Sequence, residues 1–164
     1  TENIESMNNL IKWLPENLPK EKQTSIVHGD YSLSNVMVGA RDPNVIAILD
    51  WELSTLGDPC ADFNYHCLQY TLNPKMADAS YCKEKGIPVI QDYVKIYSDN
   101  IGIDLAEEWD LYTAYNLFKL AGILQGIMGR VRDGTAASKQ AAERASGARG
   151  LADSGWELIE KNFK

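Results

Sequence analysis

Apolar residues near the start of the chain recur every three or four positions. This spacing predicts a helix over residues 4–18. Pro15 and Pro19 interrupt the pattern, and we expect them to end the helix before a polar turn. The apolar positions that define the helix are Ile4, Met7, Ile11 and Leu14.

The next part of the chain alternates between runs of β-branched residues and turn formers. Residues 25–27 are one short strand candidate, and residues 36–38 and 45–49 are two more. The segment that joins the last two, residues 39–44, is rich in turn-forming side chains. The pattern therefore predicts a β-hairpin in this region.

Helical patterns return from residue 58 onward. Asp58 followed by Pro59 is typical of a helix start, because aspartate caps free N–H groups and proline fits the first turn. We expect this helix to run through Tyr70, and a further helix over residues 89–100. The positions that the first of these helices should bury are Phe63, Cys67 and Tyr70.

The last third of the chain is also helical in pattern. Asp104 and Glu107 have capping-box spacing ahead of a wide apolar face, which predicts a long helix over residues 105–131. Residues 137–162 are rich in alanine and are predicted to be helical, although Gly147, Gly150 and Gly155 weaken the pattern. The expected fold class is therefore α+β, mainly α with a small β-hairpin.

Composition narrows the classes of function. The 164 residues are the typical length of a single domain. The formal net charge is −7, and the sequence has no run of Lys and Arg. This balance argues against nucleic acid and anionic membranes as partners.

The longest apolar region, residues 109–131, is interrupted by polar side chains and predicts a buried helix rather than a membrane span. Three cysteines without C-x-x-C spacing favour a reducing, cytoplasmic location.

A polar motif follows the first strand candidate, where residues 28–35 read His-Gly-Asp-Tyr-Ser-Leu-Ser-Asn. Phosphoryl transfer from a nucleotide needs a carboxylate that orients the attacking hydroxyl and further oxygen ligands that hold magnesium. Asp30 and Asn35 have the spacing of these groups in a kinase catalytic loop, and Asp50 follows the second strand of the hairpin. We predict that the hairpin brings Asn35 and Asp50 close together.

Each of these three residues also has an ordinary structural interpretation. Asp30 alone would suit a loop carboxylate that binds its own backbone, but within the motif it is the candidate catalytic base. Asn35 is either a turn residue or a magnesium ligand, and its spacing favours the ligand. Asp50 ends an apolar run, where an unpaired carboxylate is costly, so a metal ion or a cationic partner explains it better.

Four neighbouring residues have weaker assignments. His28 is expected to pack and hydrogen-bond so that it holds the loop, rather than to transfer protons. Glu52 is explained equally well as a second metal ligand and as a solvated side chain. Asp58 and Asp62 are candidates for bracing the catalytic loop through its backbone amides, although helix capping and exposure explain them nearly as well.

These motifs resemble those of the aminoglycoside phosphotransferase and choline kinase-like family, whose fold is that of protein kinases. The resemblance implies that Asp30 is the base, that Asn35 and Asp50 are metal ligands, and that ATP and Mg²⁺ are the cofactors. Residues 48–59 and 124–127 are similar to the kinase-like portion fused to large acyl-CoA dehydrogenases and to its free-standing bacterial relatives. The motif residues that carry the resemblance are His28, Asp30, Asn35, Asp50, Trp51, Glu52, Gly57, Asp58, Pro59 and Asp62.

The same resemblance implies that part of a kinase-like protein lies outside this sequence. The residues before Ile26 contain neither a Gly-rich loop nor a strand lysine, so residues 1–164 match a C-terminal lobe without the N-terminal lobe. We expect a fragment of a longer protein that is nearly inactive alone. Its expected partners are the N-terminal lobe and a small-molecule substrate.

Three hypotheses of function compete. The leading one is an ATP-dependent phosphotransferase that moves the γ-phosphate to a hydroxyl of a small molecule, with a hydroxyacyl-CoA or another metabolite alcohol preferred to an aminoglycoside. Ser32 stands where Ser/Thr protein kinases usually carry a lysine, which argues against a protein acceptor. The second is a pseudokinase-like binding or assembly module that self-associates through an exposed lobe interface. The weakest is a metal-dependent hydrolase that uses His28, Asp30, Asp50 and Glu52.

Overall fold

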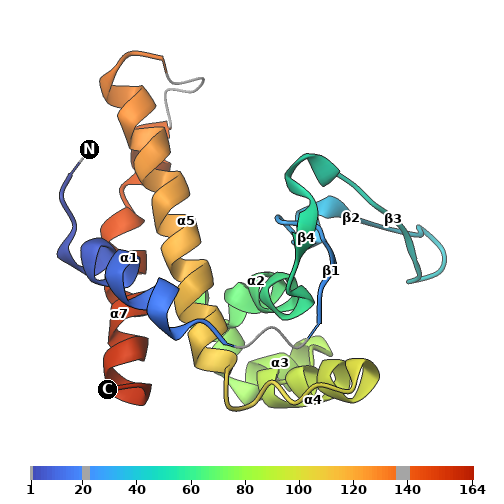
Figure 1. The fold of residues 1–164 in the computed structure, drawn as a ribbon. Coiled ribbons are helices and arrows are strands. Elements are labelled where there is room, and N and C mark those ends of the chain that lie inside the picture. The colour runs from blue at the N-terminus through green and yellow to red at the C-terminus, as the bar shows by residue number, and fades with distance from the viewer. Residues whose placement is uncertain (1, 20–22, 136–140) are drawn as a thin grey trace. The chain divides into compact units, whose positions relative to one another are not determined.

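The computed structural model describes residues 2–19, 23–135 and 141–164. It divides into two compact units, Thr1–Pro19 with Asp110–Lys164, and Lys20–Trp109. The described residues are mostly helical and include two small antiparallel sheets of two strands each (Figure 1). The expected class, mainly α with a small β-hairpin, is confirmed at this level.

The first unit is built from helices whose apolar faces meet. Buried side chains of α1, α5 and α7 form two apolar clusters. Leu10, Leu117 and Ile159, one from each helix, are fully buried. Every described helix, the 24-residue α5 included, is too short or too polar to span a bilayer. The helices of this unit are α1 (Glu5–Asn17), α5 (Trp109–Arg132), α6 (Ala141–Ala145) and α7 (Ala148–Asn162).

The helix predicted over residues 4–18 is confirmed to within one residue at each end, although Pro15 does not end it, and the predicted start of the long helix is wrong. Pro15 lies inside α1, which continues to Asn17. Proline removes the hydrogen bond to the carbonyl of Ile11, but Ile11 lies on the exposed side of the helix, where water can replace that bond. The long helix α5 begins at Trp109 rather than at residue 105, because Asp104 Oδ1 accepts the N–H of Ala106 in a turn that precedes the helix.

The alanine-rich end of the chain differs from the single helix expected over residues 137–162. Residues 137–140 lie outside the described part. From residue 141 the chain forms two helices, α6 and α7, with Ser146 and Gly147 between them. The break lies at Gly147, one of the glycines that weakened the pattern, and the serine before it bonds back to the carbonyl of Glu143.

The second unit holds the motif residues and every strand among the described residues. Its strands lie on one side of α2, and α3 and α4 lie on the other (Figure 1). The strands are β1 (Ser25–Val27), β2 (Val36–Val38), β3 (Val45–Ile48) and β4 (Thr55–Gly57). The helices are α2 (Pro59–Leu72), α3 (Ala79–Lys85) and α4 (Ile90–Ile101), with 3₁₀ turns η1 (Leu33–Asn35), η2 (Trp51–Leu53) and η3 (Pro74–Ala77).

The predicted hairpin is present, and a second strand pair accompanies it. β2 pairs with β3 in antiparallel fashion, with Val36 opposite Ile48 and an irregularity after Met37. β1 pairs with β4, so that Ser25 lies opposite Gly57. The sequence analysis missed β4, because a three-residue strand whose partner lies thirty residues away has too little local pattern to be recognised.

The helix predicted to start at Asp58 is also confirmed. Asp58 Oδ1 accepts the N–H of Cys60 at 2.9 Å, and the helix runs to Leu72. Phe63 is buried and stacks on Tyr97 of α4 with ring centroids 3.8 Å apart, which joins the two helices. Cys67 is buried as expected, whereas Tyr70 is only partly buried, since its hydroxyl reaches out to the carbonyl of Pro88.

Candidate active site

The loop after β1 passes very close to the backbone of η2. Gly29, in this loop, has φ +83°, a backbone conformation that favours glycine. A Cβ atom on Gly29 would lie 2.4 Å from the carbonyl oxygen of Leu53. Any side chain would therefore push the loop away from η2. This glycine was visible in the motif, but only the close approach of Leu53 shows what it does.

His28 is held by the backbone on both sides of its ring. It is 3% exposed, and its Nε2 lies 2.7 Å from the carbonyl oxygen of Leu49. Its Nδ1 accepts the N–H of Asp30 at 3.2 Å. These partners suit a neutral ring protonated at Nε2. Because both nitrogens already bind the backbone, His28 has the geometry of a loop-holding residue, and neither nitrogen is left for the metal ion that the hydrolase hypothesis requires.

Asp30 and Asn35 are joined by their side chains. Asn35 Nδ2 donates to the carbonyl oxygen of Asp30 at 2.9 Å and to its carboxylate Oδ2 at 3.1 Å. The backbone carbonyl of Asn35 accepts the N–H of Leu49 at 2.8 Å, and Leu49 directly precedes Asp50. The hairpin thus brings the backbone of Asn35 next to the residue before Asp50. Since the amide nitrogen of Asn35 faces Asp30, its Oδ1 is the end available to a cation.

The structure corrects the argument made for Asp50. Asp50 is exposed, and β3 before it is exposed or half-buried, so burial does not make its carboxylate costly. Its distinctive feature is instead a left-handed backbone, φ 66° and ψ 55°, the only positive φ of a non-glycine residue in the described ranges. Such conformations cost about 1–3 kcal/mol and concentrate at functional sites. Glu52, in η2, is exposed as well.

The donor set around this loop suits magnesium. Amide and carboxylate oxygens are the ligands that Mg²⁺ prefers, and an exposed carboxylate leaves room for the waters that the ion retains. Asn35 Oδ1 and the carboxylate of Asp50 would supply these oxygens, and Glu52 is the further candidate. Within the described residues, no group of three or more His, Cys, Asp and Glu side chains is close enough to hold a metal ion.

Asp62 and Asp58 differ in what they contact. Asp62 Oδ1 accepts the N–H of Gly29 at 3.0 Å, and its Oδ2 accepts the N–H of His28. The carboxylate of Asp62 therefore holds two successive amides at the start of the motif loop, residues 28–35. Asp58 is the N-cap of α2, as described above.

Further residues near the loop were not identified from the sequence. The hydroxyl of Tyr65 hydrogen-bonds to Asp30, and burial together with this bond raises the pKa of Tyr65 to about 12. His66 lies beside Tyr31, with ring centroids 5.2 Å apart, and its Nε2 is 3.1 Å from the hydroxyl of Tyr93. Burial lowers the pKa of His66. The only signal in the sequence was helical spacing, which places Tyr65 one turn after Asp62.

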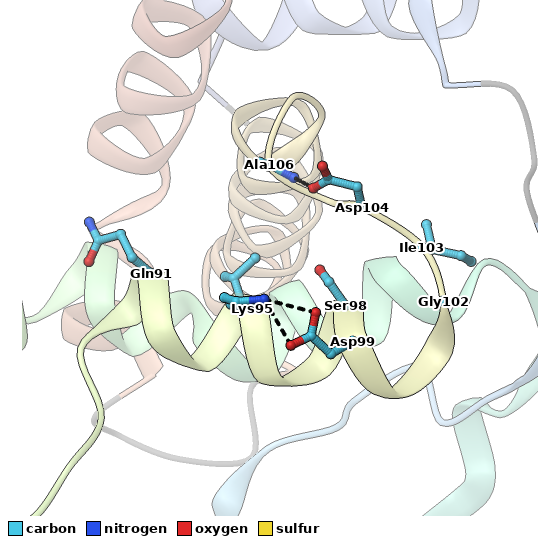
Figure 2. A pocket seen from close by; sticks show the side chains of 9 residues that line it. Gln91, Lys95, Ser98, Asp99, Gly102, Ile103, Asp104 and Ala106 are labelled. Atoms are coloured by element: carbon cyan, nitrogen blue, oxygen red, sulfur yellow. Dashed lines mark hydrogen bonds and ion pairs between the residues drawn. The ribbon is translucent and has the colours of Figure 1, made fainter.

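A cavity of about 560 Å³ lies elsewhere in this unit, along α4 and the segment that follows it (Figure 2). Lys95 and Asp99 face it and bind each other, with Lys95 Nζ 3.0 Å from Oδ1 and 2.9 Å from Oδ2 of Asp99. None of the motif residues lines this cavity. The loop that carries Asp30 is therefore a different site.

Comparison with protein families places the motif residues in a known context. The model of the phosphotransferase enzyme family matches residues 2–112. This range contains the whole motif loop of residues 28–35, the hairpin and α2. It covers more than half of the chain.

Curated proteins similar to the chain are much longer than it is. Acyl-CoA dehydrogenase family member 10 of Mus musculus is 37% identical over 166 residues, which are 98% of this chain and 16% of that protein. Acyl-CoA dehydrogenase family member 11 of Homo sapiens is 34% identical over 167 residues, 99% of this chain and 21% of that protein. The chain thus spans only 16% to 21% of the length of these relatives.

A solved structure shares the fold. A crystal structure from Ralstonia eutropha JMP134, provisionally named an aminoglycoside phosphotransferase, matches with a TM-score of 0.90 and 44% sequence identity. The match covers 100% of this chain and 51% of that one. This likeness agrees with the kinase-like fold that the motifs implied. Together with the family match over residues 2–112, it shows that the chain belongs to the phosphotransferase enzyme family.

Proposed function

We propose that this chain is the catalytic and acceptor-binding lobe of an ATP-dependent phosphotransferase that acts on a hydroxyl of a small molecule. The observation that carries the proposal is the pairing of Asp30 with Asn35 on a loop that is bonded to the backbone next to Asp50. A base, an amide and a second carboxylate are the groups that phosphoryl transfer requires. Membership of the phosphotransferase family supports the same reaction class.

In the proposed reaction Asp30 orients the acceptor. Its carboxylate accepts a hydrogen bond from the attacking hydroxyl and receives the proton as the hydroxyl oxygen bonds to the γ-phosphorus, while the bond from that phosphorus to the β–γ bridging oxygen breaks and ADP leaves. Asn35 Oδ1 and the Asp50 carboxylate would hold Mg²⁺, which offsets the charge of the nucleotide phosphates. His28 and Asp62 keep the loop in place through its backbone, so that Asp30 stays aimed at the acceptor.

We also propose that an N-terminal lobe covers the strand side of this unit. Many large apolar side chains there are exposed, and exposed apolar patches commonly mark interaction surfaces. The solved phosphotransferase chain is about twice as long as the match to it, which supports a second lobe as the occupant. The exposed side chains are Ile26, Leu33, Val38, Val45, Ile46, Leu49, Trp51, Leu53 and Leu56.

The acceptor proposed here is a metabolite alcohol, with a hydroxyacyl-CoA as the first candidate. Two relatives are named acyl-CoA dehydrogenase family members, and these names support an acyl-CoA as the acceptor class. An aminoglycoside is less favoured as the acceptor, although the relative of known structure is named an aminoglycoside phosphotransferase.

The test is an assay of the complete protein that carries this chain, with ATP, Mg²⁺ and a panel of alcohols that includes hydroxyacyl-CoA thioesters. ADP release that depends on the acceptor, together with a phosphorylated acceptor in the mass spectrum, is the expected result. Hydrolysis of a phosphoester without ATP would instead support the hydrolase hypothesis. Stable self-association without nucleotide turnover would support the assembly module.

Replacing Asp50 by asparagine should weaken the use of magnesium. Asparagine tolerates the left-handed backbone but removes the charge, so we expect the Mg²⁺ concentration for half-maximal rate to rise about 10- to 100-fold. Magnesium titrations of the initial rate measure this change. Asp42→Asn, in the exposed turn of the hairpin, is the matched control and should leave the titration unchanged. An unchanged titration in D50N would remove Asp50 from the metal site.

Glu52→Gln distinguishes the two interpretations of Glu52. A rise in the required Mg²⁺ concentration similar to that of D50N would identify Glu52 as a ligand. A curve that overlays the wild type would identify a solvated side chain, as its exposure suggests.

A further inference from the structure

Helix α2 lies along the catalytic loop almost residue by residue. Asp62 accepts the N–H groups of His28 and Gly29. One turn later the hydroxyl of Tyr65 bonds to Asp30. The next residue of the helix, His66, packs its ring against Tyr31, the residue after Asp30. One face of α2 therefore contacts successive residues of the loop, and on this face Tyr65 is the residue that contacts the candidate base, Asp30.

We propose that Tyr65 is a positioning residue that fixes the orientation of the Asp30 carboxylate toward the acceptor hydroxyl. The inference rests on the proposed function, in which Asp30 is the base. Asn35, on η1, already donates to Oδ2 of Asp30 at 3.1 Å. A second donor from α2 restricts rotation of the carboxylate about its Cβ–Cγ bond. An ionised carboxylate has about four acceptor positions, so two donors still leave room for the acceptor hydroxyl.

The chemistry of a tyrosine suits this task. Its hydroxyl is a neutral donor, so it orients the carboxylate without cancelling the negative charge that attracts the acceptor proton. Burial, followed by the bond to Asp30, raises the pKa of Tyr65 to about 12. Tyr65 therefore keeps its proton, and remains a donor, throughout the physiological pH range. A lysine or arginine in its place would pair with the carboxylate and make it a weaker base.

Tyr65→Phe in the complete protein tests the proposal, because phenylalanine keeps the ring and removes only the hydroxyl. We expect kcat to fall about tenfold, the effect of one lost hydrogen bond to a charged group. The KM values for ATP and for the acceptor should stay within about twofold of wild type, which also shows that the site remains folded. Tyr70→Phe, on the same helix, loses only the bond from its hydroxyl to the Pro88 carbonyl and should keep the wild-type kcat.

A double-mutant cycle with Asp30→Asn separates this inference from the proposed function. If Tyr65 acts through Asp30, Y65F adds no further loss of rate in the D30N background. A wild-type kcat in Y65F, an additive loss in the double mutant, or a raised KM with unchanged kcat would each overturn the role of Tyr65 while D30N keeps its strongly reduced but measurable rate. Wild-type activity in D30N itself would overturn the proposed function and this inference with it.

Discussion

Replacing Asp30 by asparagine is expected to lower kcat for phosphotransfer by about 10²- to 10⁴-fold, with little change in the KM for ATP. Asparagine has nearly the same shape but cannot take the proton of the acceptor hydroxyl. The carboxylate of Asp30 also accepts bonds from Asn35 and Tyr65, and an amide group can offer only its oxygen to these donors. The variant therefore loses both the base and part of its orientation.

The measurement for D30N is a steady-state assay with the best acceptor found, accompanied by a thermal unfolding curve. A preserved melting temperature with a reduced kcat assigns the loss to chemistry. Asp42→Asn makes the same chemical change in an exposed hairpin turn and should behave as wild type in both assays. Turnover in D30N close to that of the wild type would show that Asp30 is an ordinary loop residue.

Replacing Asp62 by alanine should damage both stability and catalysis. The two amides that its carboxylate accepts, from His28 and Gly29, would lose a charged acceptor, and His28 is buried. Hydrogen bonds to charged groups contribute about 1.5–3 kcal/mol each, so for these two bonds we expect a loss of about 3–6 kcal/mol in the free energy of unfolding. The released loop would also misplace Asp30, and a displacement of about 1 Å is enough for a hundredfold loss of rate.

Urea unfolding and the kcat of D62A measure the two effects. Asp78→Ala is the matched control, because Asp78 caps α3 by accepting the N–H of Ser80 and does not belong to the loop. It should cost about 1 kcal/mol of stability and leave kcat unchanged. If D62A and D78A lost similar stability and kept similar rates, the contact of Asp62 with the loop would be dispensable.

Local pattern was sufficient for some of the regular elements. Apolar spacing predicted α1, α2 and α4 to within a few residues, and the turn-rich segment between β2 and β3 predicted their hairpin. It failed where the outcome depended on competition between neighbours. Asp104 forms a turn with Ala106 instead of capping a helix at residue 105. In either arrangement the Asp104 carboxylate accepts a hydrogen bond from a nearby backbone N–H, so the local sequence does not distinguish them.

The candidate site was predictable only as a set of residue types. The spacing of Asp30 and Asn35 identified them as partners, and their hydrogen bond is present. The exposure of Asp50 was not predictable, because a short apolar run does not reveal whether anything covers the strand. The bonds from Tyr65 and Asp62 to the loop join residues more than thirty positions apart.

By itself, the sequence determined which side chains this protein has for chemistry and which segments form helices and a hairpin, because both depend on neighbours along the chain. Only the tertiary structure decided that β4 returns to pair with β1 and that α2 lies against the loop of Asp30. The physical reason is that hydrogen bonds and packing between distant segments depend on the path of the whole chain. The contact of α2 with the loop adds to the bond that Asn35, within the motif, already donates to the Asp30 carboxylate.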